Sequence, residues 1–329
     1  MVVAGLSIPT AALSQPGGLQ TVRPDANGPP TRVTISLFVL DVAEINDVAQ
    51  TFTTDLVARM SWQDDRLALP SEMSDVGERL IPLNEVWHPR LTLVNRRDAR
   101  IIEPDLARIT PDGGVTFEAR RVAELASPLD LHDFPFDTQL LRVDVASTRH
   151  DASELEIVVD ERGSGRMPQF SAAGWAIELA GAKVSELAIN ENERVVRIEY
   201  QLEARREGAF FVTKVIVPLS LIVFMAASVF WVDPENVGPQ LGISTASVLT
   251  LIAFQFSLVR MLPPVSYLTR IDLFLLGAMV LVFLALAEAI YTSHMTKSGD
   301  HEKALRTDRQ ARWVYLALFA GLCVVTLVL

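Results

Sequence analysis

The chain has 329 residues, of which 50% are hydrophobic and only 21% are charged, and its mean hydropathy is +0.28. These values exclude a disordered, collagen-like or disulfide-scaffolded protein and are typical of a chain partly buried in lipid. Residues 1–209 carry 21 basic and 33 acidic side chains, whereas the remainder is nearly neutral. The sequence therefore predicts an acidic soluble part followed by an apolar part, which argues against nucleic acid as a partner. The single cysteine, Cys323, excludes an intrachain disulfide.

Residues 1–30 precede the first strand-like pattern. Met1–Ser14 is apolar and ends in small residues, but it lacks the positively charged start of a signal peptide. Residues 17–30 are rich in proline and glycine. We interpret residues 1–30 as a signal remnant followed by a flexible lead-in, with a simple disordered tail as the alternative.

Residues 31–206 alternate between apolar and polar side chains in the manner of β-strands. The longest such runs are Arg32–Asp41, Gln50–Trp62 and Arg194–Glu203, and turn signals such as the Pro-Asp-Gly-Gly sequence at 111–114 separate the strands. Short strands at this spacing predict an all-β, antiparallel sandwich.

Four hydrophobic segments follow within residues 207–329, at about 210–232, 238–262, 271–293 and 313–329. About 20 apolar residues cross a bilayer as a helix, so we expect four transmembrane helices. The connection between the third and fourth segments is rich in lysine and arginine, which predicts that it is cytoplasmic. An even number of spans then places both the β-domain and the C-terminus on the periplasmic or extracellular side of the inner (plasma) membrane.

The second segment carries seven Ser, Thr and Gln side chains, more than a lipid-facing helix tolerates. One helical stripe of this segment consists of Gly238, Gly242, Ala246, Leu249, Ala253, Phe256 and Arg260. If several copies surround an axis, the stripe lines a pore, and apolar rings at Leu249 and Phe256 close it by dewetting. In the alternative interpretation, the same stripe is the core of a four-helix bundle.

Residues 127–141 read SPLDLHDFPFDTQLL. This segment resembles the signature loop of the pentameric ligand-gated ion channels, the Cys-loop receptor family, with Ser127 and Leu141 at the positions of the bridging cysteines, as in bacterial members. Further family motifs are matched by Trp62-Gln63-Asp64, by Trp87-His88-Pro89 (followed by Arg90 instead of the usual Asp), and by Arg206 twelve residues before Pro218. The resemblance covers about residues 31–329. It implies a homopentamer around an axial pore, in which each subunit has an extracellular β-sandwich and four membrane helices.

The resemblance also implies which residues couple the sandwich to the helices. Arg206 would pair with Asp137 and with an acid of the first hairpin, best matched by Asp47, through bidentate guanidinium hydrogen bonds. Breaking such a buried pair costs about 3–5 kcal/mol. An ordinary surface salt bridge, the alternative, contributes about 0–1 kcal/mol. The other coupling candidates are Phe134, Pro135, Phe136 and Pro263.

The choice of ion rests on charges near the two ends of the second segment. The inner linker contains Asp233 and Glu235, and the outer domain is acidic, which favours cations. Arg260 at the outer end favours anions. We predict cation selectivity, with an anion-selective channel as the alternative.

The ligand site of the family uses an aromatic cage that attracts amines, but the cage positions here are Val57 and Val94. Together with Arg59 and His150 they are the candidate ligand-binding residues. The ligand classes left open are a small molecule such as a small acid, a proton and a divalent cation. Titratable candidates are His88, His132 and His150. No cofactor is expected, although the acids Asp64, Asp65 and Asp75 are candidates for a regulatory calcium ion.

Glu288 lies inside the third segment, where an acid is a functional candidate by default, with a satisfied packing residue as the alternative. A membrane-anchored periplasmic sensor that does not conduct ions would also have four spans, although it would not need the polar second one. The sequence has no nucleophile elbow and no His-Glu-x-x-His pattern, which argues against an enzyme.

Overall fold

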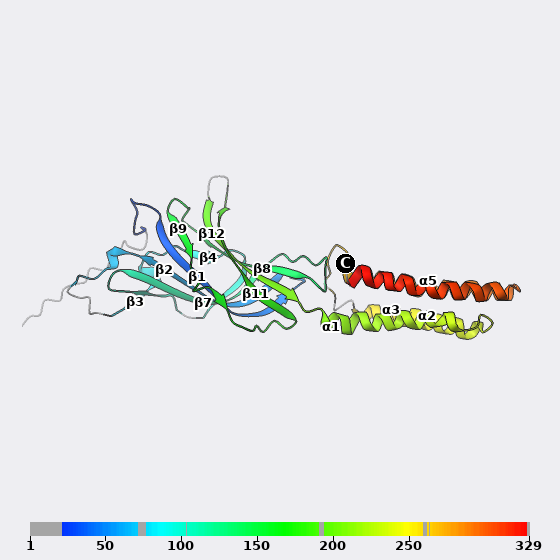
Figure 1. Ribbon diagram of the computed structural model, residues 1–329. Coiled ribbons are helices and arrows are strands. Elements are labelled where there is room, and N and C mark those ends of the chain that lie inside the picture. Colours follow the sequence, from blue (N-terminus) through cyan, green and yellow to red (C-terminus); the bar gives the residue numbers. More distant parts are fainter. Residues whose placement is uncertain are drawn as a thin grey trace, which may run out of the picture.

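The computed structural model describes residues 22–71, 77–102, 104–190, 194–258, 262 and 264–327. Figure 1 shows a β-domain and a group of long helices arranged end to end, with the C-terminal end of the last helix next to the β-domain. The last strand ends at Arg206 and the first helix begins at Ala209.

The larger sheet of the β-domain contains eight strands among the described residues. They are β1 Thr31–Asn46, β2 Thr51–Gln63, β3 Arg79–Pro82, β5 Arg96–Ile101, β6 Leu106–Ile109, β7 Gly114–Ala126, β9 Leu155–Val159 and β10 Gly165–Arg166. The three long strands of this sheet are antiparallel and lie in the order β1–β2–β7. The short strands β9 and β10 pair in parallel with β1. Two short 3₁₀ turns, η1 Asp65–Leu67 and η3 Leu83–Glu85, lie in the connections.

The smaller sheet has the order β11–β12–β8–β4. Its strands are β4 Leu91–Leu93, β8 Thr138–Ser147, β11 Trp175–Ala188 and β12 Arg194–Arg206. Alternate residues of each sheet point inward, because successive side chains of a strand face opposite sides. Ile35 and Leu37 of β1 thus share one buried cluster with Ile198 and Tyr200 of β12. The predicted β-sandwich is confirmed.

The helical domain contains four membrane-spanning helices by length and hydropathy. The first span, Ala209–Trp231, is composed of α1 Ala209–Phe211, η4 Val212–Ile216, α2 Val217–Ala227 and η5 Ser228–Trp231. The other three spans are α3 Val237–Leu258, α4 Arg270–Lys297 and α5 His301–Leu327. The π-helical turn η4 lies just before Pro218. A proline ring clashes with the carbonyl four residues earlier, and the wider π-turn relieves that clash.

The predicted start of the fourth helix at residue 313 is wrong, because α5 begins twelve residues earlier at His301. Hydropathy detects only the apolar part of this helix, whereas residues 301–312 are rich in Glu, Lys, Ala, Leu and Arg, which favour helix regardless of polarity. The connection from α4 to α5 is therefore short, and Gly299 with φ of +90° supplies the left-handed residue that ends α4.

The helices pack mainly around α4. Small side chains of α4, Ala278, Ala285 and Ala289, are fully buried and allow close approach of the neighbouring helices. Large apolar groups fill the space beside them, among them Phe274 and Phe319.

Candidate functional site

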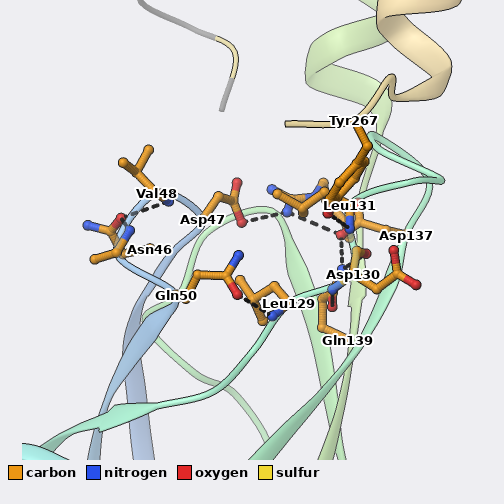
Figure 2. A network of polar contacts seen from close by, with 12 residues as sticks. Asn46, Asp47, Val48, Gln50, Leu129, Asp130, Leu131, Asp137, Gln139 and Tyr267 are labelled. Atoms are coloured by element: carbon orange, nitrogen blue, oxygen red, sulfur yellow. Dashed lines mark hydrogen bonds and ion pairs between the residues drawn. The ribbon is translucent and has the colours of Figure 1, made fainter. Parts of the chain in front are cut away.

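The boundary between the two domains is organised by Arg206, the last residue of β12. Its Nε donates to Asp137 Oδ1 at 2.7 Å, and its second guanidinium nitrogen donates to Asp47 Oδ1 at 2.7 Å. Asp137 lies before β8 and Asp47 in the β1–β2 turn, so three segments meet here (Figure 2). The Arg206 side chain is 8% exposed, Asp137 is 1% and Asp47 is 19%. Arg206, Asp137 and Asp47, which the family resemblance predicts to pair, are therefore in contact and largely buried.

Two aromatic rings complete the surroundings of the Arg206 guanidinium. Its central carbon lies 4.1 Å from the ring centre of Trp175 and 4.8 Å from that of Phe134. Burial lowers the pKa of Arg206, but hydrogen bonds to Asp47 and Asp137 outweigh this effect, so its pKa is raised and its charge is secure. Cation–π contacts of this kind strengthen when water is excluded. The guanidinium is thus held by both charge and ring faces.

The loop at residues 131–137 rests on the segment that leads into α4. The Leu131 N–H donates to Tyr267 Oη at 3.0 Å, and the Arg270 N–H donates to the His132 carbonyl at 3.1 Å. The His132 ring stacks on the Tyr267 ring with 4.0 Å between centres and 8° between planes. Figure 2 shows Tyr267 reaching toward the loop beside Leu131. Arg270 adds an ion pair with Asp133 at 2.7 Å.

The tip of this loop also contacts the first membrane helix. Phe134 and Pro135 are buried, and the Phe134 ring centre lies 4.6 Å from that of Phe211. Phe136 is 37% exposed and lies against Gly208, where a Cβ would come within 2.8 Å of the Phe136 ring. The predicted coupling residues of the loop therefore touch the beginning of both the first span and α4. Pro263 lies outside the described residues.

Three residues of the contact between the β-domain and the helices were not predicted from the sequence. They are Trp175, Arg270 and Tyr267. Trp175, the first residue of β11, is the direct cross-strand partner of Arg206, the last residue of β12. If the register of the β11–β12 pair is known, it places the Trp175 ring beside the Arg206 side chain, because residues directly opposite each other on neighbouring strands are in contact. The ion pair between Arg270 and Asp133 joins residues 137 positions apart and has no comparable local signal.

The described members of the stripe on α3 face away from the other helices of the subunit. The small residues Gly238, Gly242, Ala246 and Ala253 are all exposed. Leu249 and Phe256 are 62% and 76% exposed, although both are large and apolar. Arg260 lies outside the described residues.

The opposite side of α3 is the side that packs in the subunit. Gln240, Ser244, Ser247 and Leu251 are each at most 1% exposed. Gln240 Nε2 donates to the Val232 carbonyl at 3.1 Å, so polar groups of α3 also serve to fix its inner end. The alternative in which the stripe forms the core of the bundle is wrong, because that core contains the other face of the helix.

The four candidate ligand-binding residues are divided between the sheets of one subunit. Val57 and Arg59 lie on β2 of the larger sheet, and Arg59 pairs with Glu118 at 3.4 Å. Val94 follows β4 of the smaller sheet, is 42% exposed, and donates its N–H to the Asp144 carbonyl. His150 is 8% exposed, with its ring 5.5 Å from that of Trp87 and its Nδ1 2.8 Å from Glu154.

A cavity of about 290 Å³ lies between the two sheets of the β-domain. Apolar side chains such as Leu37, Met60 and Phe117 line most of it, together with Arg96 and with Arg121, whose guanidinium is paired with Asp105.

The described acids that the sequence suggests for calcium, Asp64 and Asp65, are engaged with other side chains and do not form a cluster of cation ligands. Asp64 is 1% exposed, and its carboxylate is paired with the Arg66 guanidinium at 2.8 Å. Asp65 accepts a hydrogen bond from Gln63, and Asp75 lies outside the described residues. Within the described ranges, no three His, Cys, Asp or Glu side chains come together as metal ligands.

Comparison with known proteins places these features in one family. Residues 19–208 match the neurotransmitter-gated ion-channel ligand binding domain, and residues 215–323 match the neurotransmitter-gated ion-channel transmembrane region. The chain is also 25% identical over 291 residues to a proton-gated ion channel of Gloeobacter violaceus, which covers 88% of this chain and 80% of that protein. Four helices long and apolar enough to cross a membrane follow the β-sandwich, as the family requires. The chain therefore belongs to the neurotransmitter-gated family of pentameric ligand-gated ion channels, and it is a multi-pass membrane channel with a large extracellular domain, not an enzyme.

Proposed function

We propose that five copies of this chain form a cation-conducting channel that is opened by protons acting on the extracellular domain and closed by apolar rings of α3. The observation that carries this proposal is the exposure of Leu249 and Phe256 on a helix whose opposite face is buried. Large apolar side chains on the free face of a membrane helix would contact either lipid or a pore. The glycines and alanines of the same stripe favour a pore, since they leave room for ions at the inner end while the two apolar rings exclude water.

Cation selectivity is supported by the charges that flank this helix. The described residues of α3 carry no charge, and the linker before it presents Asp233 and Glu235, both exposed. Five copies of each acid would surround the inner mouth. The extracellular part adds a net charge of −12 per subunit through residues 1–209, which concentrates cations near the entrance within a Debye length of about 8 Å.

A proton agonist is supported by two observations. The relative from Gloeobacter violaceus is a proton-gated channel, and the cage positions of this chain are the non-aromatic Val57 and Val94. The extracellular domain also contains an acid suited to take up a proton, Asp144 on β8. Its Oδ1 is buried without a hydrogen-bond partner. Burial raises the pKa of Asp144, and the nearby Glu199 adds to this effect, which outweighs the opposing effect of Arg197, 4.0 Å away, and of Arg142. Uptake of a proton opens a channel only if the open state binds that proton more tightly than the closed state.

The test is a current recording from the full chain in oocytes or in a planar bilayer. Outer pH would be varied from about 9 to about 4, which covers the ordinary range of carboxylates and histidine, with and without calcium to test its regulatory role. Reversal potentials would then be measured in a salt gradient. Current that rises with acidification and reverses toward the cation potential is expected. Reversal toward the chloride potential would overturn the selectivity, and acid-independent current would overturn the agonist. A silent wild type together with silent Leu249→Ala and Phe256→Ala variants would favour a sensor without conduction.

A further inference from the structure

Glu288 occupies an unusual position in the third span. It lies on α4, where no other charged residue occurs between Asp272 and His294. Both of its carboxyl oxygens are buried, and no N–H or O–H group of the described residues donates to either one. An ionised carboxylate left in such a place costs several kcal/mol, on the order of 3–5. Glu288 is therefore not a satisfied packing residue in its ionised form.

The group that faces Glu288 is a second acid, Asp308 of α5. Asp308 is 4% exposed and its Oδ1 is buried without a partner. The two carboxyl groups are neighbours and interact with each other. Two ionised carboxylates accept hydrogen bonds but cannot donate one, and in apolar surroundings their repulsion is large. A single proton between them converts the repulsive pair into a hydrogen bond.

The neighbouring charges decide which of the two acids keeps the proton. Arg312 lies one helical turn after Asp308 on the same face of α5 and attracts its negative charge. The Arg312 guanidinium donates to the Phe230 carbonyl at 2.8 Å and lies 4.4 Å from the ring centre of Trp231, so it is fixed in place. Asp233, before α3, repels the charge on Asp308. Glu288 has no such cation beside it among the described residues.

The remaining titratable groups around this pair are few. His301 lies two turns before Asp308 on α5, and its Nδ1 is 3.5 Å from Glu235. The described residues of α2 and α3 contain no charged side chain. The groups that act on the proton at Glu288 and Asp308 are thus Arg312, Asp233 and the Thr292 hydroxyl of α4, which lies beside Asp308.

We propose that Glu288 and Asp308 form a proton-binding site between α4 and α5, in which protonated Glu288 donates a hydrogen bond to ionised Asp308. This contact, together with Arg312, fastens the inner half of α5 to α4 and to the end of the first span. Loss of the proton leaves two facing carboxylates and weakens the attachment of α5. The site lies in the membrane domain, separate from the extracellular acids, and does not depend on which ion passes or which ligand opens the channel.

The first test is infrared spectroscopy of the purified full-length channel at about pH 7, well above the usual pKa of a free carboxyl group. A protonated carboxylic acid gives a C=O band that shifts in D₂O. The difference between wild type and Glu288→Gln is expected to show loss of one such band, whereas Asp308→Asn is expected to keep it. The exposed Glu302→Gln on α5 is the matched control and should retain the band. A band that persists in Glu288→Gln, or disappears in Asp308→Asn, would overturn the proposal.

The second test measures thermal unfolding of the same proteins as pH rises above about 7. Because the folded pair holds a proton that the separated helices release, its stabilisation is present at low pH and is lost as pH increases. The Tm of the wild type should therefore fall relative to that of Glu288→Gln, in which a neutral amide replaces the proton-dependent group. Glu302→Gln should follow the wild type. Parallel curves for wild type and Glu288→Gln would overturn the role of the proton in holding α5.

Discussion

Arg206 and Asp137 are 69 residues apart in the sequence, yet the Arg206 Nε donates to Asp137 Oδ1 at 2.7 Å in a place where both side chains are almost completely buried. Arg206 is the last residue of β12, and Asp137 ends the 131–137 loop, which contacts the segment that leads into α4. A displacement of either segment must therefore move the other or break the pair. The pair therefore ties the end of the strand that leads into the first membrane helix to the loop that contacts Tyr267 and Arg270.

Replacing Arg206 with alanine should abolish gating while subunits still assemble. The substitution leaves Asp137 buried with Gln139 as its only side-chain donor among the residues that the structure describes, at a cost of about 3–5 kcal/mol. Agonist-evoked current per surface-expressed channel is the measurement. Arg205→Ala is the matched control, because Arg205 is adjacent but exposed. Intact currents in Arg206→Ala would remove this pair from the coupling pathway. Arg206→Lys should rescue little, since it loses the bidentate fork and the stacking on Trp175.

Tyr267 allows the coupling contact to be dissected further. Tyr267→Phe removes the acceptor of the Leu131 N–H but keeps the ring that stacks on His132, so a shift in half-activation equivalent to about 0.5–1.5 kcal/mol is expected. Tyr267→Ala removes both contacts and should shift half-activation further. The concentration dependence of opening measures both effects. Equal shifts in the two variants would show that the stacked rings contribute nothing.

The gate prediction concerns Leu249. Leu249→Ala widens an apolar ring and lowers the free energy needed to wet it, so the channel should open at a lower proton concentration or close more slowly. A tenfold shift corresponds to about 1.4 kcal/mol. Leu221→Ala is a suitable control, because Leu221 is 64% exposed but lies on α2. An unchanged activation curve for Leu249→Ala would exclude this residue from the gate.

The Asp144 carboxyl should make the extracellular domain less stable as pH rises. Burial raises its pKa above that of the unfolded chain, so the folded state favours the protonated acid, and its contribution to stability is lost as pH increases through that raised pKa. Asp144→Asn should match the wild type at low pH and be more stable at neutral pH. Thermal unfolding at several pH values measures the difference.

The same substitution tests the proposed agonist. If Asp144 takes up an activating proton, Asp144→Asn should change the pH of half-activation. Asp151→Asn is the control, because hydrogen bonds from Ser153 lower the pKa of that exposed acid, whereas burial raises that of Asp144. Identical pH curves for wild type and Asp144→Asn would place the activating proton elsewhere.

The two domains, the number of membrane spans and the stripe on the second span could all be predicted from the amino-acid pattern. These are periodic features, because strands repeat every two residues and helices every 3.6, and both periods are visible in any short window. The sequence also provided the motif that contains Phe134 to Asp137 and, through the resemblance, the partners of Arg206. It failed at the start of α5, where helix continues into charged residues that hydropathy does not detect.

Which side of α3 is free and which is buried became known from helix packing, since the small-residue stripe and the Gln240–Leu251 face are both compatible with the sequence pattern. The same holds for Trp175 beside Arg206, Arg270 beside Asp133 and Asp308 beside Glu288. Each pair joins separate elements, so its existence depends on strand register and helix packing, which no local pattern encodes. Burial also changes the chemistry of such groups, because a carboxyl that is ordinary in water becomes a proton-binding group when its neighbours are apolar or acidic.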